Sequence, residues 1–350
     1  MRIGVGTMTG TSMDGVDAVA VQIDGHTLEM TATFLSMASR ELGSTQPVLQ
    51  SLAESGGSQE EMESAATDVG KITRETIEDL QLQLIDFIAL HGQTIFHEPP
   101  KSIQLIDTTE VADGFDCLVL TDPRQQDLQL GGQGAPITPL ADWIMFRSNE
   151  ESTAIINLGG FCNITILPAR STPADVLGCD VCCCNLLLNT IARSLLDTDF
   201  DEGGKHALQS KPDEETTHRI LEVLVAQRES RHSLGTNDTL SAFAIELCAE
   251  VNPDQLLASA TLAIGRCITE STEGIERIYL AGGGIHNEAL RNAIRHNGTT
   301  NDLGVPTQAR EGMAMAILGA LAQDGVSITL PQITGRQNTD GIVGWTQASP

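Results

Sequence analysis

The 350-residue chain has few aromatic residues, few lysines and no long apolar run. Aromatic side chains make up only 3% of it, so its cores must be built from aliphatic side chains and methionine. No stretch of the sequence reaches the roughly 18 consecutive apolar residues that a membrane-spanning helix needs. The first residues, MRIGVGTMTG, read as a strand and not as the basic segment and apolar core of a secretion signal. We therefore expect a cytoplasmic protein that does not bind membranes.

Positive charge is also scarce. Forty-seven acidic residues against twenty basic ones give a formal net charge of −27. Such a field repels nucleic acids and anionic membranes, which excludes both as partners. An acidic, lysine-poor surface is typical of a halophilic protein, because salt screens the repulsion between like charges. Any phosphate ligand must then be neutralised by a metal ion, backbone amides and a few arginines.

The eight cysteines are expected to be reduced, because no secretion signal precedes them. Four of them lie in the segment CDVCCCN, at Cys179, Cys182, Cys183 and Cys184. The C-x-x-C spacing at its start also occurs in metal and redox sites. No second such pair and no nearby histidine completes a four-ligand zinc site, so we prefer buried free thiols to a metal site.

The two halves of the chain show the same order of elements, and the length suits two domains. The predicted strands are RIGVG, DAVAVQID, TLEMTATFLSM and IDFIAL in the first half, and STAIINLGG, FCNITIL, ADVLGCD and IERIYLAGGG in the second. Helices are predicted over 59–84, 185–196, 213–227, 253–272, 287–294 and 311–321. P-loops and dinucleotide fingerprints have a helix after their glycines. Here a strand follows the glycine turn in each half, which predicts a duplicated α/β fold with a cleft between the halves.

The loop GTMTGTSMDG, from Gly6 to Gly15, fits both a structural and a ligand-binding interpretation. Its glycines permit a tight turn, and its hydroxyls can cap their own backbone. The same amides and hydroxyls suit a phosphate group. Because a second glycine turn, NLGGFCN, occurs at the corresponding place in the other half, we favour phosphate binding. The candidate ligands are the hydroxyls of Thr7, Thr9, Thr11 and Ser12 and, through water on a Mg²⁺ ion, the carboxylates of Asp14 and Asp17.

Two further polar segments follow predicted strands. HGQTIFHEP contains His91, which at a strand end is more often a structural hydrogen-bond partner than a catalyst. TDPRQQDLQLGGQGAP contains Arg124 and Asp127, which by themselves suggest a surface ion pair. Its GGQGAP portion is costly in backbone entropy, which favours close approach to a ligand or a hinge.

Two carboxylates are candidates for catalysis. Asp180 ends the predicted strand ADVLGCD at the expected cleft, where burial would raise its pKa toward that of a useful general base. It is also compatible with an N-cap role for the next helix. Glu311 begins a predicted apolar helix, where the helix dipole favours an acid in any case.

In combination, these segments resemble the anhydro-N-acetylmuramic acid kinases, which have the actin/hexokinase/Hsp70-like ATPase fold. The resemblance covers nearly the whole chain and is carried by GTMTGTSMDGVD, LHGQTIFHEP, DPRQQDLQLGGQGAP, NLGGFCNIT, Asp180 with Asn185, DEGGKHA, AGGGIHNEAL and EGMAMAILGALA. It implies two α/β lobes built from duplicated RNase H-like domains around an interlobe cleft. The N-terminal lobe would cover 1–140, with 330–350 returning to it, and the C-terminal lobe would cover 141–329.

The resemblance implies an ATP- and Mg²⁺-dependent sugar kinase. It would phosphorylate 1,6-anhydro-N-acetylmuramic acid, open the anhydro bridge with water and give N-acetylmuramic acid 6-phosphate in cell-wall sugar recycling. Asp180 would be the general base that activates the water, and Glu311 would help to hold the sugar or the water. The implied nucleotide and phosphate ligands are Gly10, Thr11, Ser12, Asp14, Gly159, Gly160, Asn163, Gly282, Gly283, Gly284 and Asn287. The implied sugar ligands are His91, Gln93, Thr94, His97 and Arg124, and a homodimer is also implied.

The chain departs from the family pattern near the catalytic aspartate. Where the family has Gly-Pro-Gly-Asn, this chain has Cys182–Asn185, and an expected aspartate in the next helical turn is Asn189. The family's Asp-Phe-Arg is Asp122–Arg124, with proline in the middle. These departures leave two alternatives open: a kinase of the same fold that acts on a different sugar, and a catalytically impaired nucleotide or sugar sensor.

Overall fold

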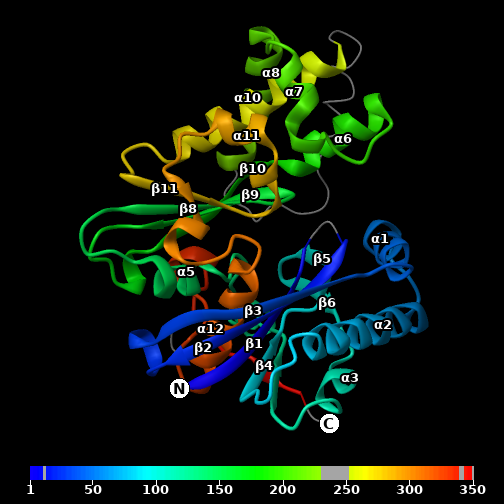
Figure 1. The fold of residues 1–350 in the computed structure, drawn as a ribbon, viewed down its shortest axis with the longest axis vertical. Coiled ribbons are helices and arrows are strands. Elements are labelled where there is room, and N and C mark those ends of the chain that lie inside the picture. Colours follow the sequence, from blue (N-terminus) through cyan, green and yellow to red (C-terminus); the bar gives the residue numbers. More distant parts are fainter. Residues whose placement is uncertain (11–12, 230–251, 339–342, 349–350) are drawn as a thin grey trace. The chain divides into compact units, whose positions relative to one another are not determined.

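The computed structural model describes residues 1–10, 13–229, 252–338 and 343–348 (Figure 1). Contacts within the chain divide it into two compact units. Unit 1 comprises Met1–Arg147, Ser171–Leu177 and Gly304–Pro350, and unit 2 comprises Ser148–Arg170 and Gly178–Leu303. The predicted limits of the two lobes stay a prediction. The contacts place residues 304–329, which were predicted for the C-terminal lobe, in unit 1.

Unit 1 is built on a sheet whose described strands follow the order β13-β7-β4-β1-β2-β3. Their bounds are β1 (Arg2–Thr9), β2 (Gly15–Asp24), β3 (Thr31–Glu41), β4 (Phe87–Leu90), β7 (Leu118–Thr121) and β13 (Thr346–Gln347). β2 is antiparallel to both β1 and β3, whereas β4 is parallel to both β1 and β7. A separate antiparallel hairpin consists of β5 (Gln93–Glu98) and β6 (Lys101–Leu105).

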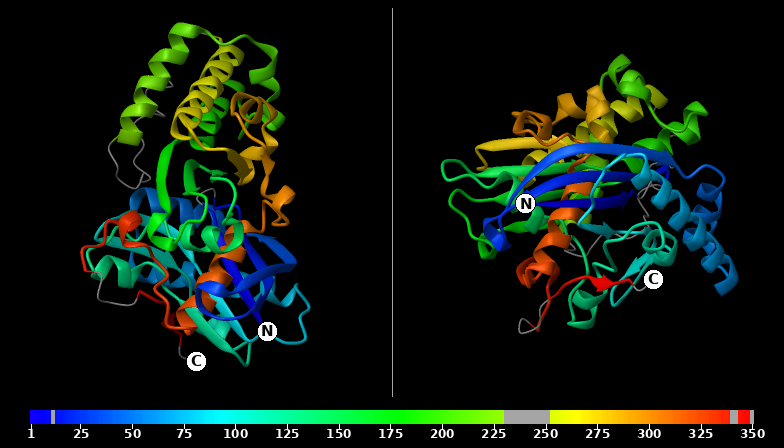
Figure 2. Two further views of the ribbon diagram at one scale, coloured as in Figure 1. Left: turned by 90° about the vertical axis from the view of Figure 1, so that its left-hand side faces the viewer. Right: turned by 60° about the horizontal axis from the view of Figure 1, so that its bottom comes forward.

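Helices cover both faces of this sheet because neighbouring residues of a strand point to opposite sides. On one face, Val5 of β1 packs in a cluster with Ile77 and Val111, which belong to α2 and α3. On the other face, α12 crosses β1 so closely that a Cβ on Gly6 would lie 2.0 Å from the carbonyl oxygen of Gly312 (Figure 2). The helices of unit 1 are α1 (Thr45–Ser55), α2 (Gln59–Glu78), α3 (Thr108–Ala112), α4 (Gln125–Gln129), α5 (Pro139–Phe146), α12 (Arg310–Gln323) and α13 (Pro331–Thr334).

Unit 2 repeats this design. Its described strands follow the order β10-β9-β8-β11-β12, with β9 antiparallel to β8, and β11 and β12 parallel to their neighbours. Their bounds are β8 (Thr153–Leu158), β9 (Phe161–Leu167), β10 (Leu177–Cys183), β11 (Arg277–Ala281) and β12 (Gly298–Thr299). The helices are α6 (Asn185–Leu196), α7 (Lys205–Gln209), α8 (Glu214–Glu229), α10 (Pro253–Ser271) and α11 (Glu288–Ala293). The shared strand order confirms the predicted duplicated α/β fold.

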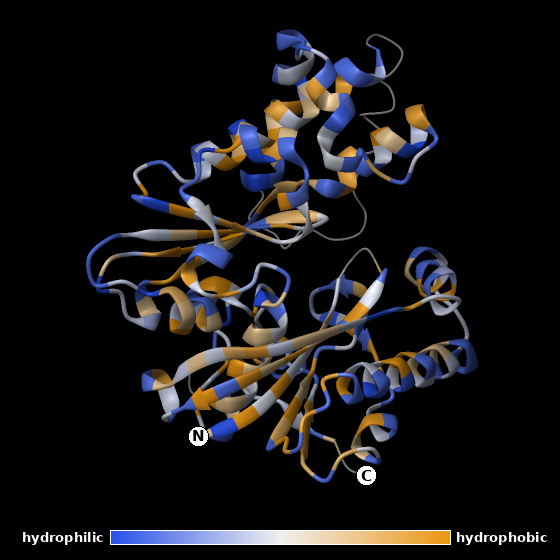
Figure 3. Ribbon diagram, in the orientation of Figure 1, coloured by the Kyte–Doolittle hydropathy of each residue, from blue (hydrophilic) through white to orange (hydrophobic). Residues whose placement is uncertain are grey.

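The cores are largely aliphatic, as the scarcity of aromatic residues predicts. In unit 2, Ile156 and Leu158 of β8 pack in one cluster with Leu187 of α6 and Ile264 of α10. Figure 3 shows apolar residues along β1 and β2, and both apolar and hydrophilic residues on α2, as expected of a helix with one face on a sheet. Among the described residues, no helix combines the length and apolar character that crossing a membrane would require.

Most predicted elements are observed, with differences at their ends. α6 and β9 occupy the predicted segments 185–196 and FCNITIL. The helix predicted over 59–84 ends at Glu78, and the preceding helix α1 was not predicted. The strand expected to end at Asp180 continues to Cys183, so Asp180 lies inside β10 and not at its end. The N-cap of α6 is Cys184, which makes the N-cap role considered for Asp180 wrong.

Candidate active site

The opening glycine loop is a tight turn after β1. The Met13 amide donates to the carbonyl of Gly10 at 3.2 Å, and Met13 has a positive φ of 53°. Asp14 follows as an exposed residue. Thr11 and Ser12, two of the predicted phosphate ligands, lie outside the described residues. The described ends of the loop therefore form a turn, as the glycine pattern predicts.

The segment HGQT ties this loop to the end of β4. The Thr9 hydroxyl and the His91 Nδ1–H both donate to the carbonyl oxygen of Gly92, each at 2.8 Å. Gly92 has a φ of 74°, which favours glycine there. The Gln93 amide donates to the carbonyl of Gly10 at 3.2 Å. Thr9 is thus committed to the protein, and its buried hydroxyl serves the fold.

His91 positions Arg124. The guanidinium of Arg124 donates from Nη2 to His91 Nε2 at 3.0 Å and from Nη1 to the carbonyl of Gly134 at 2.8 Å. Burial, followed by the nearby Arg124 charge, lowers the pKa of His91 to about 3, so the imidazole is neutral near pH 7. Since both ring nitrogens have protein partners and the side chain is only 2% exposed, His91 acts through Arg124.

Asp127 anchors the GGQGAP loop from within the core. It is fully buried and accepts hydrogen bonds from the Gly134 amide at 2.8 Å and from the hydroxyls of Thr329 and Thr334 at 2.7 and 2.9 Å. A Cβ on Gly132 would lie 2.0 Å from its carboxylate, so that position needs glycine. The surface position considered for Asp127 is therefore wrong. This carboxylate fixes the loop that receives the Arg124 guanidinium.

The β5–β6 hairpin adds two polar residues, Ser102 and Gln104, that the sequence analysis did not identify. His97 and Thr94 of β5 pair across the hairpin with Ser102 and Gln104 of β6. His97 Nδ1 lies 2.9 Å from the Ser102 hydroxyl, and the Gln104 amide donates to that hydroxyl at 2.7 Å. Burial and the Arg124 charge lower the pKa of His97 to about 4. The alternation in SIQL, with polar residues two apart, is the signal that identifies Ser102 and Gln104 as sharing one face.

Glu311 lies in the first turn of α12, beside a buried ion pair. Its neighbour Arg310 donates from Nε to Asp142 at 2.9 Å, and both partners are almost fully buried. Burial raises the pKa of Glu311, the Arg310 charge opposes this shift, and the charge of Asp17 adds to it. The close packing of Gly312 on β1 and β2 holds this end of the helix against the sheet. The unit thus holds a half-buried carboxylate whose pKa lies above its ordinary value.

Asp14 and Asp17 are the residues that fit a Mg²⁺ ion. Burial raises the pKa of Asp17, the Ser39 hydroxyl at 2.5 Å opposes this, and the charge of Asp14 raises it further. A cation would relieve the repulsion between these two carboxylates. In the part of the chain that the structure describes, no group of three or more acidic, histidine or cysteine side chains could hold a metal. Mg²⁺ commonly uses one or two carboxylates together with water and substrate phosphate, so this pair suits it.

In unit 2, the diglycine turn supports the segment that follows Asp180. The carbonyls of Gly159 and Gly160 accept hydrogen bonds from the amides of Asn185 and Cys184 at 3.1 and 2.9 Å. These amides at the start of α6 are therefore used inside the protein. Asp180 is half-buried on β10, and Asn163 is half-buried on β9.

The cysteines after Asp180 belong to the core of unit 2. Cys182, Cys183 and Cys184 are fully buried, whereas Cys179 is exposed. The thiols of Cys182 and Cys267 are hydrogen-bonded to each other. Burial raises the pKa of Cys184 to about 12, which keeps it protonated. The residues that replace the family's Gly-Pro-Gly thus fill the interior of the unit.

The triglycine turn after β11 packs against β8. A Cβ on Gly282 or Gly284 would lie within 3 Å of Leu158, so both positions need glycine. A Cβ on Gly283 would meet nothing within 4 Å, and this residue is exposed. Asn287 caps α11, with its side-chain oxygen 3.0 Å from a backbone amide of the first turn. Gly283 is the position of this turn whose backbone is open to a ligand.

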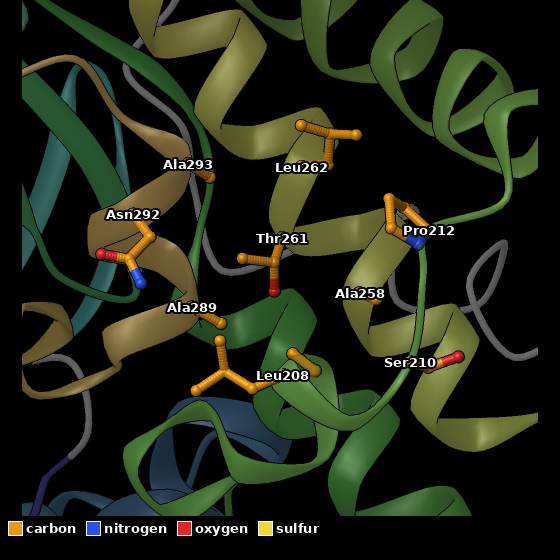
Figure 4. A pocket seen from close by; sticks show the side chains of 10 residues that line it. Leu208, Ser210, Pro212, Ala258, Thr261, Leu262, Ala289, Asn292 and Ala293 are labelled. Carbon is orange, nitrogen blue, oxygen red and sulfur yellow. The ribbon is translucent and has the colours of Figure 1, made fainter.

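A cavity of about 210 Å³ lies among α7, α10 and α11 of the same unit (Figure 4). Most of its lining is apolar, and Leu208 at its edge is half exposed. The buried Thr261 hydroxyl, also in the lining, has no hydrogen-bond partner. None of the residues predicted from the sequence as ligands lines this cavity, although Ala289 in its wall is two residues beyond Asn287.

A family model described as anhydro-N-acetylmuramic acid kinase matches residues 2–344. A protein of that name from Salinibacter ruber is 30% identical over 372 residues, covering 95% of this chain and 93% of the relative. Another, from Synechococcus elongatus, is 28% identical and covers 96% of both chains. Among solved structures, the activator of 2-hydroxyisocaproyl-CoA dehydratase from Clostridium difficile, with bound ADPNP, has a TM-score of 0.49 at 13% identity, covering 92% of this chain and 96% of that one.

Proposed function

The chain belongs to the anhydro-N-acetylmuramic acid kinase family, and we propose that it phosphorylates 1,6-anhydro-N-acetylmuramic acid with ATP while water opens the anhydro bridge. The products would be N-acetylmuramic acid 6-phosphate and ADP. One observation carries this proposal: the family match runs from residue 2 to residue 344, and so spans both units and every residue predicted for the site. The enzyme is a sugar kinase.

The reaction joins a hydrolysis to a phosphoryl transfer. Asp180 takes a proton from a water molecule, and the water oxygen attacks the anomeric carbon C1. The C1–O6 bond breaks, and O6 uses the electron pair of that bond to attack the γ-phosphorus of ATP. The bond from the γ-phosphorus to the bridging oxygen breaks, and ADP leaves. The steps assist each other because the leaving group of the first is the nucleophile of the second.

The buried cysteines favour an active enzyme over a disabled sensor. Cys182, Cys183 and Cys184 are fully buried in the core and have no contact with solvent. Their side chains therefore do not fill space on the surface of the unit that a sugar or nucleotide would need. Asp180 is held within the regular strand β10, which limits its backbone freedom.

The sugar side of the reaction is assigned to polar residues of unit 1. Glu311, whose pKa is raised by burial, would hold the sugar or the attacking water. Arg124, positioned by neutral His91, would supply positive charge to an anionic sugar in a chain of net charge −27. Gln93, Thr94 and His97 would contribute neutral hydrogen-bonding groups. The neutrality of His97 suits recognition of hydroxyl and amide groups.

The phosphate side is assigned to the glycine turns. Gly10–Asp14, Gly159–Gly160 with Asn163, and Gly282–Gly284 with Asn287 would bind ATP. Asp14 and Asp17 would hold Mg²⁺ through water, and the ion when bound would neutralise charge on the phosphates. The exposed, unobstructed backbone at Gly283 supports an approach by the nucleotide to that turn.

We also propose a setting for this activity. A net charge of −27 repels nucleic acids and anionic membranes, so the enzyme would act in the cytoplasm, where the reaction would recycle a cell-wall sugar. The active form would be a homodimer, as the family resemblance implies. Sedimentation in the salt concentration that gives maximal activity would measure this state.

Mass spectrometry of the product tests the reaction. The wild-type enzyme, with Mg-ATP and anhydro-N-acetylmuramic acid in water enriched in ¹⁸O, should give a phosphorylated sugar with the label at C1 and none in the phosphate. Asp180→Asn should reduce turnover by a factor of about 100 or more while leaving ATP binding intact. Asp199→Asn, an exposed aspartate of the same unit, is the matched control and should retain turnover. Full turnover in Asp180→Asn, or label in the phosphate, would contradict the assignment.

A further inference from the structure

The β5–β6 hairpin has one apolar face and one polar face. Ile95 and Leu105 are buried in a cluster with residues of α1 and α2. The other face carries Thr94, His97, Ser102 and Gln104. In addition to the hydrogen bonds at Ser102 described above, the Gln104 amide donates to the Thr94 hydroxyl at 3.3 Å.

Two atoms at the ends of this network have no partner. His97 Nε2 and Gln104 Oε1 are buried, and neither has a hydrogen-bond partner in the protein. Fully buried Gln93, at the start of the same hairpin, also has an unpartnered side-chain oxygen. Buried polar atoms are almost always paired, since leaving them unpaired costs free energy. Unpaired atoms gathered on one hairpin therefore point to a bound group that completes them.

The network identifies which of these atoms donates and which accepts. The Gln104 amide donates to the Ser102 hydroxyl, so the hydroxyl proton is free to go elsewhere. Its two available acceptors are His97 Nδ1 at 2.9 Å and the Phe96 carbonyl at 3.4 Å, and the shorter contact is the stronger one. A neutral imidazole that accepts at Nδ1 carries its proton on Nε2. His97 Nε2–H is thus a donor, and Gln104 Oε1 is an acceptor.

We propose that His97 and Gln104 bind the 2-acetamido group of the sugar, with His97 Nε2–H donating to its carbonyl oxygen and Gln104 Oε1 accepting from its N–H. This inference rests on the proposed function, since it names a group of that substrate. The acetamido group is the substituent that presents a donor and an acceptor on different atoms, which suits two separate side chains. Ser102 is the positioning residue, because it fixes the tautomer of His97 and the orientation of the Gln104 amide.

The low pKa of His97 serves this role. Burial and the charge of Arg124 lower that pKa to about 4, so the ring stays neutral and keeps one proton at physiological pH. A charged imidazolium would instead attract a carboxylate. The neutral pair therefore selects an uncharged polar group, and leaves the anionic part of the sugar to Arg124.

Substrate discrimination by a Gln104 variant tests the proposal. Gln104→Met keeps the length of the side chain and removes its oxygen. We expect kcat/KM for the acetamido sugar to fall about tenfold, mainly through KM. We expect kcat/KM for the analogue with a hydroxyl at C2 to change little. The ratio of kcat/KM for the 4-deoxy analogue to that for the parent sugar should also stay nearly the same. Gln22→Met, in β2 of the same unit, is the matched control and should leave all three values unchanged.

Ser102→Ala provides a second, independent variant. Without its hydroxyl, the His97 tautomer and the Gln104 amide lose their common anchor, so preference for the acetamido sugar should fall as in Gln104→Met. Thermal unfolding of both variants shows whether the hairpin remains folded. The proposal would be overturned if kcat/KM fell equally for the acetamido and hydroxyl sugars, or for neither of them. It would also be overturned if the variants lost discrimination at C4 in place of C2.

Calorimetry separates this inference from the proposed function. If the wild-type enzyme phosphorylates none of the anhydro sugars, the proposed function fails. Binding of the acetamido sugar and of its 2-hydroxy analogue, measured without nucleotide, then still tests the subsite. The acetamido sugar should bind the wild type more tightly, and Gln104→Met should abolish the difference. Equal binding of both sugars to the wild type would overturn the subsite.

Discussion

The candidate site residues of unit 1 and unit 2 are held in different ways. In unit 1, side-chain hydrogen bonds join distant segments: Thr9 binds Gly92 across 83 positions, and Arg310 binds Asp142 across 168. In unit 2, backbone contacts at glycines dominate, as where Gly284 lies against Leu158. Two units with the same strand order thus hold their candidate site residues by different kinds of contact. In unit 1 the polar pairs act together with close glycine contacts such as that at Gly312, whereas the turns of unit 2 depend mainly on side chains being absent.

The largest expected effect comes from breaking a polar pair in unit 1. Arg310→Met removes the ion-pair partner of the Asp142 carboxylate, whose side chain is 0% exposed. Removing one member of a buried ion pair typically costs about 3–5 kcal/mol of the free energy of unfolding. Urea denaturation at constant high salt would measure the loss. Activity should fall with it, because Glu311 follows Arg310 directly in α12.

The double variant Asp142→Leu with Arg310→Met is the control. It removes both charges and fills the site with apolar side chains, so it should regain most of the stability lost by the single variant. A single variant as stable as the wild type would show that the pair is not important to unit 1. If the double variant were no more stable than the single one, the loss would come from packing and not from the broken ion pair.

The next effect probes the glycine contacts of unit 2. Gly284→Ala would place a Cβ 2.7 Å from the Cβ of Leu158, and overpacking of this kind typically costs about 1–3 kcal/mol. Gly283→Ala is the matched control, because a Cβ there meets nothing within 4 Å. It should leave the free energy of unfolding unchanged and raise KM for ATP if the nucleotide approaches this turn. Equal stability losses in the two variants would contradict the role given to close packing.

The sequence predicts the fold of both units well because the signals are local. Strand patterns and glycine turns gave the order of elements, and α6 and β9 occupy their predicted segments. The end of β10 was missed: the strand continues past Asp180 through the fully buried residues Val181, Cys182 and Cys183.

The side-chain network of unit 1 could not be predicted in the same way. Asp127 looked like half of a surface pair, and its actual partners Thr329 and Thr334 lie more than 200 positions away. Choosing such partners requires the tertiary fold. The only sequence signal for Ser102 and Gln104 is that polar residues alternate in SIQL. Many surface strands show the same alternation, so it does not predict a site. In unit 2, by contrast, the glycines that the contacts need are visible in the sequence as GG and GGG.

The smallest expected effect is a pH dependence specific to unit 1. His91 has a pKa of about 3 in the folded protein, against 6.5 for a free imidazole, because it is buried next to Arg124. Below pH 6.5 the unfolded chain therefore binds a proton at His91 that the folded chain does not. Since the unfolded state then holds more protons, the free energy of unfolding falls as the pH is lowered through this range.

Replacing His91 with glutamine should remove that part of the acid sensitivity. Between pH 7 and pH 5.5, the wild type should lose about 1 kcal/mol more of its free energy of unfolding than His91→Gln does, because one proton-linked group is gone. The variant will be less stable at pH 7, since Arg124 loses a partner, so the comparison is between the two slopes and not the two values. Urea denaturation at both pH values and fixed high salt measures them, with carboxylate titration common to both proteins. Parallel slopes would mean that His91 is protonated in the folded state, and that Arg124 is held by its contact with the Gly134 carbonyl alone and not by a neutral imidazole.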